Sequence, residues 1–188
     1  MGGLVARWLI EKEDGGAIVD HLVMCGTPNA GSPFGEVSKA RKVLLALMGI
    51  GSTFAWPVCA TIASVLSASA KLTGTLEQLA PDSDFIRALN TATPTATRYT
   101  ILAGNIADYQ ADDPAFFAGL LDKLSRSATL DLLLGSTAHD VAATVSSIRL
   151  DDVPGDHPAV RTTVACHHLN YFTSPAGRAA LSAVEWGA

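Results

Sequence analysis

The chain has 188 residues, of which 48% are hydrophobic and 16% are charged, and its formal net charge is -5. These values are typical of one globular domain, and they exclude a disordered, collagen-like or disulfide-dense chain. The acidic balance, without a basic stripe, argues against nucleic-acid binding as the main task. The cysteines show no C-x-x-C spacing, so we expect small buried side chains rather than a disulfide framework or a zinc site at Cys25, Cys59 and Cys166.

The first predicted elements are a helix and a strand. Apolar residues recur at the spacing of one helix face and stop before Gly15-Gly16; they are Leu4, Val5, Trp8 and Leu9. Residues 17–25 are then typical of a strand. Its second half, 22–25, is continuously apolar, which favours a strand covered on both faces in a parallel sheet. A loop rich in turn-forming residues follows at 26–33.

Residues 43–70 carry no charge. A membrane span would need about 20 apolar residues in succession, and the glycines, serines and proline of this segment interrupt any such run. We therefore expect helices here, which either pack in the core or form an apolar cover over a binding site.

The second half of the chain alternates helices and strands, which predicts a parallel α/β sheet. The expected elements are, in order, a short helix over 85–89 capped by Asp82 or Ser83, a strand at 98–105, a helix from Asp113-Pro114, a strand at 161–166, and a last helix from Ser174-Pro175 with Leu181 and Val184 on its apolar side.

Several motifs carry a resemblance to a known family. The opening residues 1–7, M-G-G-L-V-A-R, are similar to those that follow the nucleophilic serine of the G-x-S-x-G elbow in the lipase branch of the α/β-hydrolase family. Three further strings match that branch in its order: a G-T-P-x-x-G-S loop at 26–32, an L-x-P-x-S-x-F segment at 79–85, and a C-x-H-[FL]-x-Y-F ending at 166–172. The chain therefore resembles the C-terminal part of that family along nearly its whole length.

This resemblance implies a fold and a missing residue. The fold would be an incomplete α/β-hydrolase fold: one partial domain over 1–188 that holds the C-terminal half of a mostly parallel sheet, with flanking helices and a helical lid-like insertion at 36–75. The nucleophilic serine would precede Met1, whose backbone N–H would be an oxyanion donor but is here a terminal amine. We expect a polypeptide that begins at an internal methionine, as a gene fragment, a misassigned start or a deliberate truncation.

The acid and the base of such an enzyme can be sought among the residues present. A serine hydroxyl attacks an ester only when an imidazole takes its proton, and a carboxylate must hold that imidazole in one tautomer. Asp140, within His139-Asp140-Val141, is the candidate acid, although it could instead cap a turn or a helix. The competing aspartates are Asp108, Asp112, Asp113, Asp151, Asp152 and Asp156.

His168 is the candidate base. It is preferred to His167 because neighbours on an extended backbone face opposite ways and because the family spacing to Tyr171-Phe172 favours it. We expect His21 and His157 to be structural or exposed. Ser32 and Ser136 are not expected to replace the missing nucleophile, because neither lies on a strand-to-helix elbow.

Two functions follow as hypotheses. The first is the C-terminal portion of a lipase- or esterase-like serine hydrolase, inactive without its serine, for a lipid or other carboxylic ester. Core packing is the alternative role of its candidate substrate-wall residues, which are Met48, Phe54, Trp56 and Leu66. The second is a non-catalytic hydrolase remnant that binds a partner or a membrane surface and self-associates through the exposed strand 17–25.

The sequence also bears on cofactors and on the cellular compartment. Neither hypothesis implies a cofactor, a metal or a nucleic acid. No signal peptide is visible, so a cytoplasmic location is the default, although a targeting segment could precede Met1.

Overall fold

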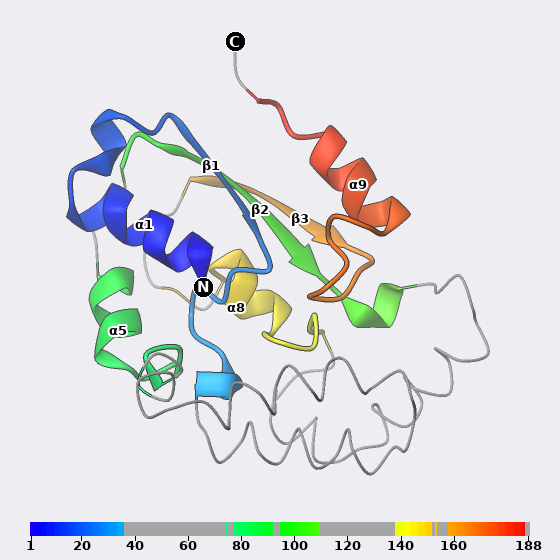
Figure 1. Cartoon of the computed structure of the whole chain (residues 1–188), viewed down its shortest axis with the longest axis horizontal. Helices are drawn as coiled ribbons and strands as arrows, with labels where there is room; N and C mark the ends of the chain where they lie inside the picture. The colour runs from blue at the N-terminus through cyan, green and yellow to red at the C-terminus, as the bar shows by residue number, and fades with distance from the viewer. Residues whose placement is uncertain are drawn as a thin grey trace.

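The computed structural model describes residues 1–35, 74, 77–91, 95–109, 138–151, 153 and 158–186. Within these ranges, the strands β1 (His21–Cys25), β2 (Arg98–Gly104) and β3 (Ala159–Val164) form one parallel sheet in the order β1-β2-β3, and helices flank it (Figure 1). The predicted parallel α/β arrangement is therefore confirmed at this level.

The two faces of the sheet carry separate apolar clusters. Side chains alternate along β2, so Tyr99, Ile101 and Ala103 pack with Ile10 of α1 (Gly2–Lys12) and Ile148 of α8 (Val145–Arg149). On the opposite face, Leu102 and Val164 pack with the last helix, α9 (Pro175–Ser182), through Ala176, Ala180 and Leu181. The sheet is thus held between α1 and α8 on one side and α9 on the other.

The helix predicted at the start of the chain is confirmed as α1, and its predicted apolar face is confirmed for Leu4 and Trp8 but wrong for Val5 and Leu9. The buried residues are Leu4, Arg7 and Ile10, whereas Val5 is 61% exposed and Leu9 is 44% exposed. Arg7 can be fully buried because its guanidinium donates to Glu11 Oε1 and Oε2 at 2.8 and 3.2 Å. This ion pair within the helix compensates the burial of the Arg7 charge, so an arginine can lie on the buried face.

The strand predicted at 17–25 is shorter than expected. Residues Gly15–Ala17 form the 3₁₀ helix η1, which follows Asp14 in the left-handed region (φ 57°), and extended pairing begins only at His21. The strand predicted at 161–166 lies two residues earlier, as β3, and Cys166 follows it. Cys166 is fully buried and burial raises the pKa of its thiol to about 12, which agrees with its expected role as a small buried side chain.

Side-chain caps fix the starts of three helices. Ser83 Oγ accepts from Ile86 N at α5 (Asp84–Asn90), so Ser83 rather than Asp82 is the cap. Thr144 caps α8 and Ser174 caps α9 in the same way. Helix α1 begins without a side-chain cap.

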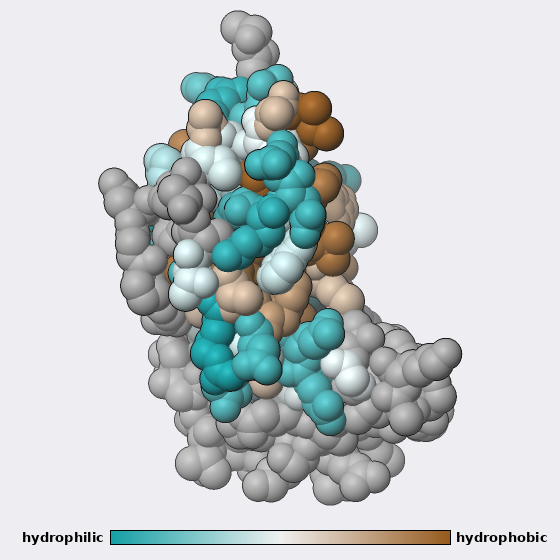
Figure 2. Space-filling view, turned by 90° about the vertical axis from the view of Figure 1, so that its left-hand side faces the viewer, coloured by the Kyte–Doolittle hydropathy of each residue, from teal (hydrophilic) through white to brown (hydrophobic). Residues whose placement is uncertain are grey.

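The segment predicted to form a lid, 36–75, lies outside the described residues apart from position 74, and its wall candidates Met48, Phe54, Trp56 and Leu66 lie there too. The helix predicted from Asp113 also lies outside them. None of the described helices is long and apolar enough to cross a bilayer. Among the coloured residues in Figure 2, hydrophilic ones run through the middle of the view and the most hydrophobic ones lie mainly along its right-hand edge.

Candidate active site

The candidate acid and base meet beyond the carboxyl ends of the strands. Asp140 lies on a loop between β2 and α8, and His168 lies on the loop between β3 and α9. His168 Nδ1 is 2.8 Å from Asp140 Oδ2. Ligand sites of open parallel sheets commonly lie at this end of the sheet, where loops from several strands converge.

Burial differs sharply within this pair. The side chain of Asp140 is 0% exposed, whereas that of His168 is 38% exposed. Within the described part of the chain, Nε2 of His168 has no hydrogen-bond partner. The imidazole is therefore held by a sealed carboxylate through one nitrogen and offers the other to its surroundings, which is the arrangement that a general base needs.

The loop that carries Asp140 is organised by this residue itself. Oδ1 of Asp140 accepts from the backbone N–H of Ala142 and of Ala143, both at 2.9 Å. The backbone carbonyl of Asp140 accepts from the N–H of His168 at 2.8 Å. The turn-capping role that the sequence left open for Asp140 and the contact with His168 are thus both present, one on each carboxylate oxygen.

The residue after Asp140 is strained. Val141 has φ 86°, a backbone conformation that costs a β-branched residue free energy. Its N–H donates to Nδ1 of His139 at 3.1 Å, and the His139 carbonyl accepts from Ile106 N. The loop is therefore tied to the residues that follow β2 on one side and to His168 on the other.

Tyr171 is a third member of the site that the motif analysis named without giving it a role. Its hydroxyl donates to Asp140 Oδ2 at 3.1 Å and accepts from the backbone N–H of Gly104 at 2.6 Å. Burial is the main cause that raises the pKa of this phenol far above its usual value, so the hydroxyl stays protonated. The signal available in the sequence was its position three residues after His168.

Two glycines enclose these groups. A Cβ at Gly26, which has φ +60°, would lie 2.8 Å from Asp140 Oδ2 and 3.0 Å from His168 Nδ1. A Cβ at Gly104 would lie 2.7 Å from the hydroxyl of Tyr171. The ends of β1 and β2 can approach the pair only because these positions carry no side chain.

The G-T-P-x-x-G-S loop holds the acid loop in place. Asn29 Nδ2 donates to the Ile148 carbonyl at 2.7 Å, Ser147 Oγ donates to Gly31 O at 2.7 Å, and Ser32 Oγ donates to Ala142 O at 2.6 Å. Ser32 is buried, and its hydroxyl links this loop to the loop that carries Asp140. This agrees with the expectation that Ser32 does not act as the nucleophile.

The competing residues have other surroundings. His167 packs edge-on against Tyr109, with ring centroids 5.5 Å apart, while Asp108 accepts from Asn105 and Asp151 accepts from Arg149. The remaining competitors lie outside the described residues; they are Asp112, Asp113, Asp152, Asp156, His157 and Ser136. Of the described alternatives, none forms the acid–base contact that Asp140 and His168 share.

The start of α1 lies against the loop that follows β1 (Figure 1). A Cβ at Gly3 would lie 2.1 Å from Thr27 Oγ1, and Thr27 directly follows Gly26. Burial lowers the pKa of the Met1 amine. The first turn of α1 is therefore a neighbour of the acid–base pair through two consecutive loop residues, while the oxyanion role expected of Met1 stays a prediction.

Residues 1–185 match the family described as Domain of unknown function (DUF7379). The chain belongs to this family. No curated protein and no solved structure matches it.

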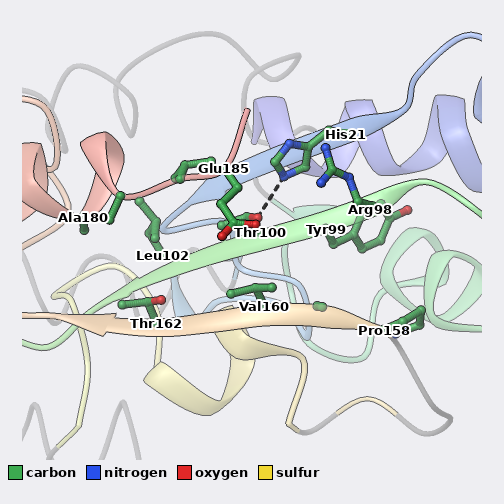
Figure 3. A pocket seen from close by; sticks show the side chains of 13 residues that line it. His21, Arg98, Tyr99, Thr100, Leu102, Pro158, Val160, Thr162, Ala180 and Glu185 are labelled. Atoms are coloured by element: carbon green, nitrogen blue, oxygen red, sulfur yellow. Dashed lines mark hydrogen bonds between the residues drawn. The ribbon is translucent and has the colours of Figure 1, made fainter. Parts of the chain in front are cut away.

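A hollow of about 560 Å³ lies on the α9 face of the sheet in this DUF7379 protein (Figure 3). His21 lines it and its Nε2 is 2.8 Å from Thr100 Oγ1, which agrees with a structural role for His21. Neither Asp140 nor His168 lines this hollow, so it is separate from the pair. No group of His, Cys, Asp or Glu that could hold a metal occurs among the described residues of the DUF7379 chain.

Proposed function

We propose that this chain carries the acid and the base of a serine hydrolase that acts on carboxylic esters, in a lipase- or esterase-like α/β-hydrolase fold. The observation that carries the proposal is the contact of 2.8 Å between the sealed carboxylate of Asp140 and the exposed imidazole of His168. Tyr171, Gly26 and Gly104 add support, because they lie against the buried carboxylate while the imidazole of His168 remains partly exposed.

The reaction assigns one role to each residue. A serine on polypeptide that precedes Met1 would attack the ester carbonyl while its proton passes to Nε2 of His168. Asp140 would stabilise the resulting imidazolium through Nδ1. The imidazolium would then protonate the leaving alkoxide, which leaves an acyl-serine. A water would attack this acyl group while His168 takes its proton, and the imidazolium would return a proton to the departing serine oxygen.

The resemblance supports this location of the serine, and the position of α1 is consistent with it. The opening helix begins beside Thr27, next to the glycine that contacts the pair. Among the described serines, Ser32 and Ser147 are committed to backbone carbonyls. In a triad enzyme, loss of the nucleophile lowers turnover by roughly a millionfold, or about 8 kcal/mol of barrier. The chain from Met1 alone should therefore show no triad-dependent hydrolysis.

The decisive experiment extends the protein by the in-frame sequence that precedes Met1 and measures hydrolysis of a short-chain nitrophenyl ester. We expect the extended protein to turn over the ester and to react with a fluorophosphonate probe. Asp140→Asn and His168→Ala should each lower turnover by roughly a thousandfold or more.

His21→Ala is the matched control, because His21 also contacts an oxygen at 2.8 Å but lies in the separate hollow. It should retain most of the turnover. Full activity in the Asp140→Asn and His168→Ala variants, or no reaction of the extended protein with either reagent, would reject the proposed function.

A second candidate, a non-catalytic module that self-associates, draws support from the edge of the sheet. Among the described residues, β1 pairs with β2 alone, so its outer edge has no strand partner there. Under this function the chain would sediment as a dimer or larger species, and Val23→Lys on β1 would shift it toward monomer. A monomer at all concentrations would count against it.

A further inference from the structure

The two partners of the Tyr171 hydroxyl determine where it donates its proton. One of its two partners, the backbone N–H of Gly104, can only donate, and it does so at 2.6 Å. The other partner, Asp140 Oδ2, is a carboxylate oxygen 3.1 Å away. The phenol proton therefore points at Oδ2, the same oxygen that contacts Nδ1 of His168 at 2.8 Å.

The two carboxylate oxygens of Asp140 accept hydrogen bonds from different donors. Oδ1 accepts two N–H groups from the loop of Asp140 itself. Oδ2 is shared by Tyr171 and His168, so the two donors compete for its electron density. A stronger bond from one donor makes Oδ2 a weaker acceptor for the other.

We propose that Tyr171 is a positioning residue for the acid–base pair: its hydroxyl, anchored on the end of β2, sets how strongly Asp140 holds the imidazole of His168. This inference deepens the proposed function and takes its catalytic meaning from it. The contact itself exists without a substrate and can be measured without one.

The geometry separates this role from simple packing. The ring of Tyr171 meets that of His168 edge-on, at 85° and with centroids 6.4 Å apart, and phenylalanine would keep this contact. Tyr171→Phe therefore removes the hydroxyl and leaves the ring. Tyr99→Phe is a matched control, because Tyr99 on the same strand as Gly104 also donates its hydroxyl to a carboxylate, Glu11 Oε1, at 2.8 Å.

The test reads the Nδ1–H proton of His168 by NMR in protein labelled with ¹⁵N-histidine, and assigns it by its loss in Asp140→Asn. A proton held by a carboxylate resonates far downfield, and further downfield as the bond strengthens. In Tyr171→Phe we expect the resonance to move further downfield, because His168 no longer shares Oδ2. Tyr99→Phe should leave it in place.

A second arm keeps the hydroxyl, so that it does not depend on the folding of Tyr171→Phe. Fluorotyrosine at position 171 is a more acidic phenol and a stronger donor to Oδ2, and burial keeps it protonated. The His168 resonance should then move upfield, while fluorotyrosine at position 99 should not move it. Opposite displacements in the two arms are the signature of competition for one oxygen.

The outcomes that overturn the inference are specific. If the resonance does not move in either folded variant, Tyr171 has only a structural role. If the parent protein shows no far-downfield Nδ1–H resonance, His168 does not donate to Asp140 Oδ2, and the two donors do not share that oxygen. Failure of the extended protein to hydrolyse esters, with the displacements observed, would reject the proposed function and leave the role of Tyr171 intact.

Discussion

At the scale of single residues, Asp140 illustrates how one side chain can organise both its own loop and a neighbour. Its two oxygens accept four hydrogen bonds, two from its loop and two from the side chains of His168 and Tyr171. A buried carboxylate needs such compensation, because an unpaired charge in the interior is very costly. The interpretations of Asp140 as a turn cap and as an acid were therefore not exclusive.

The backbone strain at Val141 should lower the free energy of unfolding, so relieving it should raise that free energy. Its φ of 86° is unfavourable for a β-branched residue and easy for glycine. We expect Val141→Gly to raise the free energy of unfolding by about 1 kcal/mol in urea titrations, after the entropic cost of glycine is subtracted. Val145→Gly, at the first residue of α8, should lower it by about 1 kcal/mol or more, because the Val145 side chain packs against the core. Equal losses at both positions would show that Val141 stores no strain.

His167 should make the protein acid-sensitive. Burial is the main cause that lowers its pKa below 6.5 in the folded protein, and its Nδ1 accepts from Leu169 N at 3.3 Å, which requires an unprotonated nitrogen. The unfolded chain then binds more protons, so this stability is complete above the unfolded pKa and is lost as pH falls through 6.5 toward the folded value.

The measurement compares unfolding free energies at about pH 7.5 and about pH 5.5. The parent protein should lose more stability between these values than His167→Gln, in which nothing titrates at this position. The same loss in both proteins would assign the acid sensitivity to other groups.

At the scale of elements, α1 is fixed by a buried polar network. Besides Glu11, Arg7 reaches Asn29 on the loop after β1 and Asn90 at the end of α5, at 3.1 and 3.3 Å. Glu11 also accepts from Tyr99 on β2. One arginine therefore connects α1 to a loop and to a second helix, while its partner carboxylate connects α1 to the sheet.

Removing the Arg7 side chain should lower the free energy of unfolding strongly. Arg7→Met would leave Glu11 buried and unpaired with a cation, and we expect a loss of about 3–5 kcal/mol in unfolding free energy. The double variant Arg7→Met with Glu11→Leu should recover much of that loss. Arg87→Met, which breaks the exposed pair with Asp84 on α5, should change little. A small effect at Arg7 would show that the network contributes little to stability.

At the scale of the whole molecule, five parts of the chain meet at one end of the sheet: the start of α1, the loop after β1, the end of β2, the loop of Asp140, and the loop of His168 and Tyr171. Much of this could be predicted, since apolar runs locate the strands and Ser-Pro and Asp-Ser patterns locate helix starts. The pairing of Asp140 with His168 was expected from the motif resemblance and from the need of a catalytic imidazole for a carboxylate partner. Hydropathy and local spacing predict the strands and the helix starts, whereas this pairing came from the motifs.

Other features could not be read from the sequence. The buried face of α1 depends on Arg7, whose burial requires partners from distant segments. The extra turn at Gly15–Ala17 depends on a left-handed Asp14 rather than on hydropathy. The role of the Tyr171 hydroxyl depends on Gly104, 67 residues away. Such contacts are long-range, and local patterns do not encode them.

A change in the helix α9 should also affect the surroundings of His168. A Cβ at Gly177 of α9 would lie 2.1 Å from the backbone oxygen of Tyr171. We expect Gly177→Ala to cost about 2 kcal/mol or more, because backbone must shift, and to alter the His168 Nδ1–H resonance. Gly2→Ala, where no atom lies within 4 Å of the new Cβ, should be nearly neutral. An unchanged resonance in Gly177→Ala would show that α9 is independent of the pair.

The tight packing of α9 against the backbone of Tyr171 has a practical consequence for work with the protein. A helix that gives no side chain to Asp140 or His168 nevertheless bears on the residue that touches their shared oxygen. We therefore expect any change that displaces α9, such as a bulky fusion placed directly after it, to alter the surroundings of the imidazole through Tyr171.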